Sequence, residues 1–221
     1  MRYIYLHGFA SGPLSRKAQA FQAALVGENI ELEIPDLAQK DFEHLTISGQ
    51  LQVIENLLNS EPCRLVGSSM GGYLAALYAS THSEVERLVL LAPAFGFASR
   101  WREMQGADVI AQWRDTGWLE VFHYGDKTTR RVHYELLEDA ASLPPYPDFR
   151  QPAIIFHGIH DSVVPISLSR QFVLSHQNAD LRELDSDHEL LNVLQKITAA
   201  ALPFLLAHGF EKTKPGTPVN N

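Results

Sequence analysis

The chain has 221 residues, of which 45% are hydrophobic and 20% are charged, values that indicate an ordinary globular domain and argue against a wholly disordered chain. Its formal net charge is −8, from 18 Lys and Arg against 26 Asp and Glu. The acidic balance and the lack of a basic stripe exclude nucleic acid as an expected partner, because binding a polyanion requires clustered Lys and Arg.

Short apolar runs alternate with longer amphipathic segments, a pattern typical of a parallel sheet with helices on both faces. The sequence predicts strands at Arg2–Leu6, Ile30–Ile34, Arg64–Val66, Arg87–Leu91, Ala153–Phe156 and Leu181–Leu184. It predicts helices at Ser15–Leu25, Leu45–Leu58, Gly71–Thr81, Ile166–His176 and Glu189–Leu206. Because parallel neighbours need right-handed crossovers, we expect an α/β fold, a three-layer sandwich around a mostly parallel central sheet of about six strands.

One segment, Ala94–Arg150, interrupts this alternation and is too long for a plain loop. It holds all three tryptophans of the chain. Within it, Trp118–Tyr124 and Thr129–Tyr134 are expected to pair as a hairpin, with a helix following to Ala140. We interpret the segment as a cap inserted into a core domain.

This interpretation divides the chain into a core and two further parts. The core domain would comprise residues 1–93 and 151–207, and the cap residues 94–150. Residues 208–221 are rich in Pro, Gly, Lys and Asn and are expected to form a flexible tail.

The most informative motif is Gly67-Ser68-Ser69-Met70-Gly71, which has the pattern Gly-x-Ser-x-Gly. A strand-like run ends just before it and a helix-like segment begins just after it, which is the context of a nucleophile elbow. On so tight a turn the serine takes a strained conformation, and a Cβ two positions away on either side would obstruct it. The turn would present the Ser69 hydroxyl at the carboxyl edge of the sheet and the Met70 amide at a helix N-terminus.

A serine hydroxyl needs a base to act as a nucleophile, and behind such an elbow the partners follow in the order Ser, Asp, His. His188 is the predicted base, because it lies between the last predicted strand and the final helix. Asp161 is the predicted acid, because it directly follows the preceding strand. Its carboxylate would hold the tautomer of His188 and stabilise the imidazolium.

Neighbouring side chains offer alternatives for both roles, and we rank them behind Asp161 and His188. His157 and His160 are nearer to the predicted acid, but a triad acid rarely lies on the same loop as its histidine. Asp185 and Asp187 flank the predicted base, yet side chains so close in sequence cannot easily reach its ring nitrogen.

An oxyanion hole needs two backbone donors, one after the nucleophile and one from the loop after an early strand. The predicted donors are the amides of Met70 and Phe9, and Gly8 would let the loop backbone come close. A phosphate-binding loop is excluded, because Pro13 follows Gly12 where that motif requires lysine.

Taken together, these residues resemble the α/β-hydrolase superfamily. Within it the chain is similar to the small single-domain esterases and thioesterases of the YqiA/YcfP type, and more loosely to the abhydrolase-domain acyl-protein thioesterases. The resemblance is carried in order by Tyr3–Phe9, Val66–Gly72, His157–Pro165 and Ser186–His188. It implies the triad Ser69, Asp161 and His188 with the donors Phe9 and Met70. It also implies a chain that starts at the third strand of the larger members.

The predicted function is therefore a serine hydrolase that cleaves a small-molecule carboxylic ester or thioester through an acyl-serine intermediate. No cofactor is required. A zinc site is not expected either, because His188-Glu-Leu-Leu-Asn192 lacks the second histidine of the zinc motif. The alternative is a protein of the same fold that binds a small ligand without turning it over.

The aromatic residues of the insertion have two interpretations, an apolar acyl pocket or simply the core that a segment of this size needs for itself. On the first, Trp101 and Trp118, together with His7, contact the substrate. No apolar run reaches the roughly 18 residues of a membrane span, and no signal-peptide layout opens the chain, so a cytoplasmic protein is expected.

Overall fold

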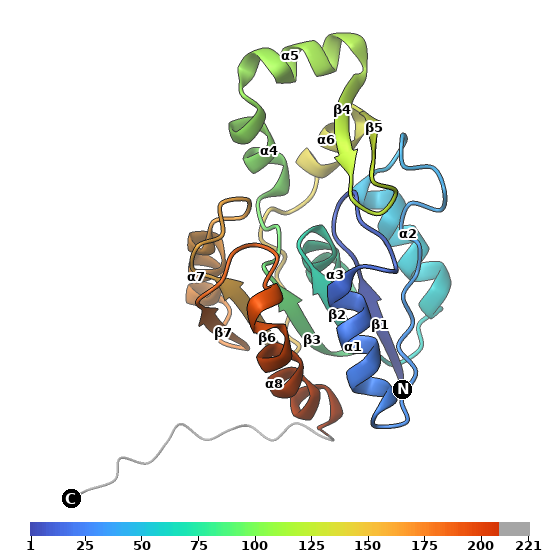
Figure 1. Cartoon of the computed structure of the whole chain (residues 1–221), viewed down its shortest axis with the longest axis vertical. Coiled ribbons are helices and arrows are strands. Elements are labelled where there is room, and N and C mark those ends of the chain that lie inside the picture. Colours follow the sequence, from blue (N-terminus) through green and yellow to red (C-terminus); the bar gives the residue numbers. More distant parts are fainter. Residues whose placement is uncertain (208–221) are drawn as a thin grey trace, which may run out of the picture.

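The structure is a computed structural model, and it describes residues 1–207; the tail predicted at 208–221 lies outside the described residues. Within the described part, five parallel strands form the central sheet in the order β1-β2-β3-β6-β7 (Figure 1). Their bounds are β1 Arg2–Leu6, β2 Cys63–Ser68, β3 Val85–Leu91, β6 Ala153–Gly158 and β7 Ala179–Leu184.

Helices cover both faces of this sheet (Figure 1). One face packs against α1 (Arg16–Val26) and α8 (Leu194–Leu206), and the other against α2 (Ile47–Leu58), α3 (Met70–Thr81) and α7 (Ile166–Ser175). Strand side chains alternate between the two layers, so that Ile4 and Leu6 join the cluster on the α3 side while Tyr3 and Tyr5 join the α1 side. The three-layer α/β sandwich expected from the sequence is confirmed.

Local side chains set where helices begin and end. The hydroxyl of Ser15 accepts a hydrogen bond from the Ala18 amide at the start of α1. At the start of α2, the hydroxyl of Thr46 accepts one from the Gly49 amide. Helix α2 ends at Asn59, whose backbone is left-handed. Within residues 1–207, no helix is both long enough and apolar enough to cross a membrane.

The strand predicted at Ile30–Ile34 is reduced to one bridge between Ile4 and Glu33. Two backbone hydrogen bonds form there, from the Tyr5 amide to the Glu33 carbonyl at 2.8 Å and from the Glu33 amide to the Tyr3 carbonyl at 2.9 Å. Pro35 follows and has no amide hydrogen to continue the ladder. The segment therefore extends the edge of the sheet without forming a sixth strand.

Residues 94–150 connect β3 to β6 and lie beyond the carboxyl ends of the strands (Figure 1). They fold into α4 (Phe97–Gln105), α5 (Ala107–Thr116), the antiparallel pair β4 (Trp118–His123) and β5 (Thr128–His133), and α6 (Glu135–Ala141). We call this segment the insertion. The predicted hairpin and the helix after it are both present.

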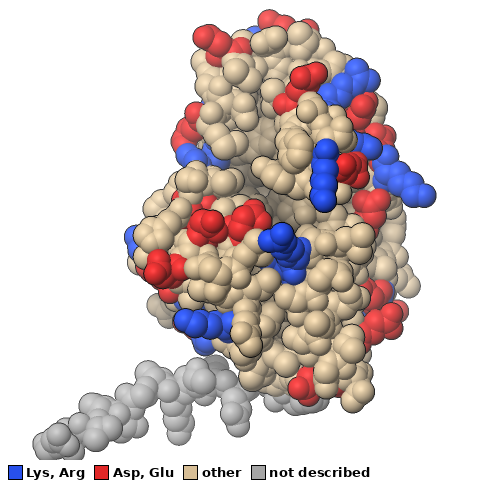
Figure 2. All heavy atoms as spheres, in the orientation of Figure 1, with Lys and Arg blue, Asp and Glu red and all other residues tan. Residues whose placement is uncertain are grey.

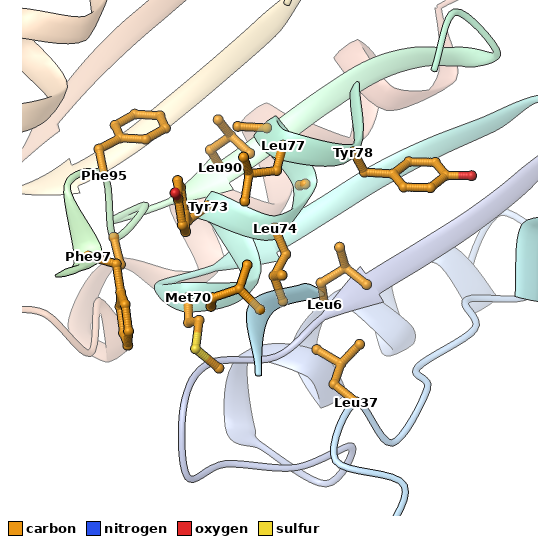
Figure 3. Close-up of a cluster of buried hydrophobic side chains, with 14 of the residues drawn as sticks. Leu6, Leu37, Met70, Tyr73, Leu74, Leu77, Tyr78, Leu90, Phe95 and Phe97 are labelled. Carbon is orange, nitrogen blue, oxygen red and sulfur yellow. The ribbon is translucent and has the colours of Figure 1, made fainter. Parts of the chain in front are cut away.

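The insertion shares its buried side chains with the sheet. Trp113 and Leu137 belong to the same hydrophobic cluster as Met70 and Tyr73 of α3. Figure 3 shows this cluster running from the strands through α3 to Phe97, at the start of the insertion. One continuous core therefore reaches from the sheet into the inserted elements.

Candidate active site

Ser69 lies on the turn between β2 and α3, with φ 55° and ψ −118°. A residue other than glycine adopts a positive φ only when the surrounding structure holds it there. A Cβ at position 67 would lie 2.3 Å from the carbonyl oxygen of Gly71, and one at position 71 would lie 2.0 Å from that of Leu6. Glycine is therefore required at both positions, for the steric reason expected from the sequence.

The backbone of Ser69 also joins the sheet to the insertion. Its amide donates to the carbonyl oxygen of Leu91, the last residue of β3, at 2.8 Å. Its own carbonyl oxygen accepts a hydrogen bond from Ala94, the first residue of the insertion, at 3.0 Å. The serine thus lies where the insertion leaves the carboxyl edge of the sheet.

The side chains of Ser69, His188 and Asp161 are connected by two hydrogen bonds. The Oγ of Ser69 lies 3.1 Å from Nε2 of His188, and Nδ1 of His188 lies 2.7 Å from Oδ2 of Asp161. With an ionised Asp161, Nδ1 carries the proton that is donated to the carboxylate, and Nε2 accepts from the serine hydroxyl. This geometry can provide a serine with a base, and the base with an orienting acid.

Four donors approach the carboxylate of Asp161 within the described chain. Its Oδ1 accepts from the amides of Val163 at 2.9 Å and Val164 at 2.7 Å. Its Oδ2 accepts from His188 and lies 3.3 Å from Nε2 of His157. Burial alone would raise the pKa of Asp161, but the hydrogen bonds from both histidines and Val164 outweigh it and hold the pKa well below the usual value. Asp161 is therefore ionised at neutral pH.

Of the alternative partners weighed from the sequence, His157 contacts the Asp161 carboxylate, whereas the other three have different partners. Nε2 of His160 pairs with Oδ1 of Asp185 at 3.0 Å, and both side chains are exposed. Oδ1 of Asp187 accepts from the amides of Glu189 at 3.0 Å and Leu190 at 3.3 Å. In the part of the chain that the structure describes, Asp161 is thus the carboxylate bonded to the ring of His188.

The loop that carries His188 replaces the first turn of the predicted final helix. Helix α8 begins at Leu194, after a short 3₁₀ turn at Leu191–Val193, and not at Glu189. Leu190 has φ 57°, in the left-handed region. The Asp187 carboxylate holds this turn through its two amide contacts, so the residues after His188 form a fixed loop and not a helix.

A glycine brings the acid and base loops together. A Cβ at Gly158, the last residue of β6, would lie 2.4 Å from the carbonyl oxygen of Ser186 and 2.5 Å from that of Asp187. The roles of Gly158 and Asp187 were not foreseen from the sequence. For Gly158, the available signal was a glycine at the end of the strand that precedes Asp161.

The loop after β1 lies directly against the elbow. A Cβ at Gly8 would come within 3.4 Å of Ser69 Cβ and 3.9 Å of its Oγ. These are ordinary contact distances, so the close approach does not itself require glycine at this position, contrary to the expectation. A side chain there would instead occupy space beside the hydroxyl. The amides of Phe9 and Met70 stay predicted oxyanion donors.

The ring of Phe9 connects this loop to the insertion. It packs edge-on against Trp101, with the ring centroids 5.0 Å apart, and lies 5.4 Å from the ring of Phe42. The tip of the hairpin adds a backbone contact, because the Tyr124 amide donates to the Ala10 carbonyl at 2.7 Å. The inserted elements therefore hold the loop that carries Phe9.

The three predicted substrate contacts have different surroundings. His7 is buried, with Nδ1 3.0 Å from the Gly8 carbonyl and Nε2 accepting from the Leu37 amide at 3.4 Å, and burial lowers its pKa. Trp101 packs among other rings beside Phe9, whereas Trp118 packs against the guanidinium of Arg131 and two histidine rings. Their contact with substrate stays a prediction.

The surface is hollowed between the insertion and the sheet-bearing part, and acidic and basic side chains are mixed on this face (Figure 2). A separate open pocket of about 480 Å³ lies beside the His188 loop and is lined by His160, Asp185, Ser186, Asp187, Glu189, Leu191 and Asn192. The triad side chains do not line it. Among the described residues, no three His, Cys, Asp or Glu side chains are grouped so as to hold a metal ion.

Residues 2–205 match the model of an uncharacterised protein family, UPF0227. The chain belongs to the UPF0227 family. This UPF0227 protein is also 30% identical to human monoacylglycerol lipase ABHD6 over 126 residues, which are 48% of this chain and 36% of the lipase. The bovine lipase is 27% identical over 181 residues, 73% of this chain and 49% of the lipase. The chain therefore spans about half or less of the curated relatives it matches.

Several solved structures share the fold of this UPF0227 protein. A protein from Agrobacterium vitis has a TM-score of 0.81 at 23% identity, covering 92% of this chain and 87% of its own. Est1E from Butyrivibrio proteoclasticus, with ferulic acid bound, has a TM-score of 0.78 at 22% identity, with coverages of 92% and 87%. Mouse α/β-hydrolase domain-containing protein 10 has a TM-score of 0.78 at 18% identity, with coverages of 91% and 88%. The chain has the α/β-hydrolase fold.

Proposed function

We propose that this protein is a serine hydrolase that cleaves carboxylic esters or thioesters through an acyl-serine intermediate. The observation that carries the proposal is the connection of Ser69, His188 and Asp161 by hydrogen bonds of 3.1 and 2.7 Å on a strained elbow. The similarity to monoacylglycerol lipases supports ester hydrolysis as the reaction.

In the proposed mechanism, Ser69 Oγ attacks the carbonyl carbon while its proton passes to Nε2 of His188. The amides of Phe9 and Met70 donate to the oxygen of the tetrahedral intermediate. His188 then gives its proton to the leaving alcohol or thiol, and the acyl-serine forms. Water repeats the sequence to release the acid, while Asp161 stays ionised and stabilises the imidazolium.

The proposed acyl group is apolar and of small or medium size. Met70 follows Ser69 and belongs with Phe97 and Trp101 to one apolar cluster, against which Phe9 packs, so apolar side chains gather beside the elbow. The ferulic acid bound to the similar protein Est1E supports an aromatic or apolar acyl group. We further propose that residues 94–150 act as a cap over a core of residues 1–93 and 151–207.

The test is labelling with a fluorophosphonate probe, followed by hydrolysis of p-nitrophenyl esters from acetyl to decanoyl. We expect one adduct, on Ser69, located by mass spectrometry. Ser69→Ala should abolish the adduct and lower kcat by about 10⁴-fold or more. Rates should rise with acyl length before they fall.

The matched control is Ser68→Ala, which removes the neighbouring buried hydroxyl and should leave the adduct in place. A folded wild-type protein that forms no adduct would contradict the proposal and favour a ligand-binding protein of the same fold. Equal rates for all acyl lengths would contradict the apolar acyl site but not the serine hydrolase mechanism.

A further inference from the structure

A second histidine contacts the carboxylate of the proposed triad. The His157 side chain, near the end of β6, is fully buried. Its Nε2 lies 3.3 Å from Oδ2 of Asp161 and 2.8 Å from the carbonyl oxygen of Val164. Its Nδ1 lies 2.8 Å from Oγ of Ser169, which is also fully buried.

These contacts determine which ring nitrogen of His157 carries the proton. Both neighbours of Nε2 are oxygens without hydrogen, so Nε2 must be protonated. Its hydrogen is donated to the Val164 carbonyl at 2.8 Å, and the same polar N–H group faces Oδ2 of Asp161 at 3.3 Å. Nδ1 can then accept from the Ser169 hydroxyl. The N–H of His157 therefore faces the Asp161 carboxylate.

The two histidines share one carboxylate oxygen. Oδ2 of Asp161 accepts a hydrogen bond from Nδ1 of His188 at 2.7 Å and lies 3.3 Å from Nε2 of His157. Oδ1 is held by the amides of Val163 and Val164. Rotation of the Asp161 carboxylate would therefore break contacts on both oxygens. His157 restrains Oδ2, the oxygen that accepts the hydrogen bond from His188.

We propose that His157 is a positioning residue for hydrolysis, which holds Oδ2 of Asp161 in line with Nδ1 of His188 and moderates the negative charge that His188 meets. The inference rests on the proposed function, because it needs His188 to be the base. The inference goes beyond the proposed function because it gives a role to His157, a side chain that is sealed from solvent and that substrate does not reach.

Other charged groups face the same region and must be held constant. Lys17 of α1 donates to the His188 carbonyl at 3.4 Å, and it also faces the charges of Asp187 and Glu189. Glu183 of β7, paired with Arg170 of α7, faces His157. All of them are retained in variants at position 157, so a change of pH profile between those variants reports the histidine.

Removal of the His157 donor should leave more uncompensated negative charge on Oδ2 of Asp161. That charge favours protonated His188, so the acid limb of the kcat/KM profile should move to higher pH. Loss of a hydrogen bond to a charged group should also lower kcat by about tenfold. KM should not change, because His157 is sealed behind the triad.

The experiment compares His157→Leu, which removes the donor, with His157→Gln, whose amide can replace it, in hydrolysis of p-nitrophenyl butyrate across pH. We expect the leucine variant to show the shifted acid limb and the lower kcat, and the glutamine variant to restore both toward wild type. His176→Leu is the matched control, because His176 is also buried but contacts Phe172 and not the triad. It should leave the acid limb in place.

A leucine variant with wild-type kcat and acid limb would overturn the inference, as would equal losses in the leucine and glutamine variants without a pH shift. If the leucine variant does not fold, long-range ¹H–¹⁵N NMR of the wild-type protein decides instead. The Nε2–H tautomer of His157 is expected, and the Nδ1–H tautomer would leave nothing to donate to Asp161. A wild-type protein that hydrolyses nothing and forms no Ser69 adduct would overturn the proposed function itself.

Discussion

At the scale of single residues, three glycines stand where a neighbouring carbonyl occupies the place of a side chain. Gly67 and Gly71 let the elbow fold on itself and on β1, and Gly158 lets the His188 loop approach β6. In each case a Cβ would lie 2.0–2.4 Å from a backbone oxygen, a separation that no small adjustment relieves. The positions of Ser69, Asp161 and His188 therefore depend on the absence of a Cβ at the three glycines.

Gly71→Ala tests this dependence at one position. Its Cβ would lie 2.0 Å from the Leu6 carbonyl oxygen, so β1 and the elbow must separate. We expect a loss of about 3 kcal/mol or more in the free energy of unfolding, measured by urea denaturation. The control is Gly12→Ala, where nothing lies within 4 Å of the new Cβ, and a change below about 0.5 kcal/mol is expected. Equal stability of both variants would refute the steric account.

At the scale of elements, the insertion supports the loop that follows β1. Helix α4 contributes Trp101, which packs edge-on against Phe9, and the β4–β5 hairpin contributes the Tyr124 amide to the Ala10 carbonyl. The same hairpin is tied to the segment before α2, where the His133 amide donates to the Glu43 carbonyl at 2.8 Å. The inserted elements thus support the loop that carries the proposed oxyanion donor Phe9.

Trp101→Ala tests whether the insertion contributes to the placement of the Phe9 loop as well as to stability. Loss of a buried indole leaves a cavity and should cost about 3 kcal/mol of unfolding free energy. Because Phe9 loses its neighbour, its amide should be less well placed, and kcat for an acetyl ester should fall.

Met104→Ala, an exposed position on the same helix, should change neither quantity. An acetyl ester is the informative substrate, because its acyl group is too short to report a lost apolar pocket. If Trp101→Ala is less stable but keeps the wild-type kcat for this ester, the Phe9 loop does not need the insertion.

At the scale of the whole molecule, the insertion and the sheet share one hydrophobic cluster. Val132 and Leu136 of the inserted elements belong to the same buried cluster as Leu6, Leu74 and Leu90. An insertion with its own core could unfold separately, whereas a shared core couples the two parts. The shared cluster favours a single cooperative transition.

The positions of the tryptophans allow a direct test. All three lie between residues 94 and 150, so their fluorescence reports the insertion, while far-UV circular dichroism reports mainly the helices and strands of the whole chain. We expect coincident urea transitions by the two probes. A fluorescence transition at clearly lower urea would mean that the insertion unfolds as a unit of its own.

Much of the fold followed from local patterns. Short apolar runs predicted all five strands of the sheet, and helical spacing predicted α1, α2, α3 and α7 within a few residues. The elbow could also be predicted, because its glycines act on atoms close by in the sequence. The carboxyl ends of parallel strands share one edge, which is why the loops after β2, β6 and β7 were expected to meet there.

The remainder depended on contacts between distant segments. The sequence by itself determined the α/β sandwich, the elbow at Ser69 and the choice of Asp161 and His188 as its expected partners. Only the tertiary structure decided that Ile30–Ile34 pairs through a single bridge and that the buried Nε2 of His157 lies 3.3 Å from the Asp161 carboxylate. Periodicity and turn chemistry act within a few residues, whereas the partner of a polar group depends on which distant surfaces packing brings within hydrogen-bond reach.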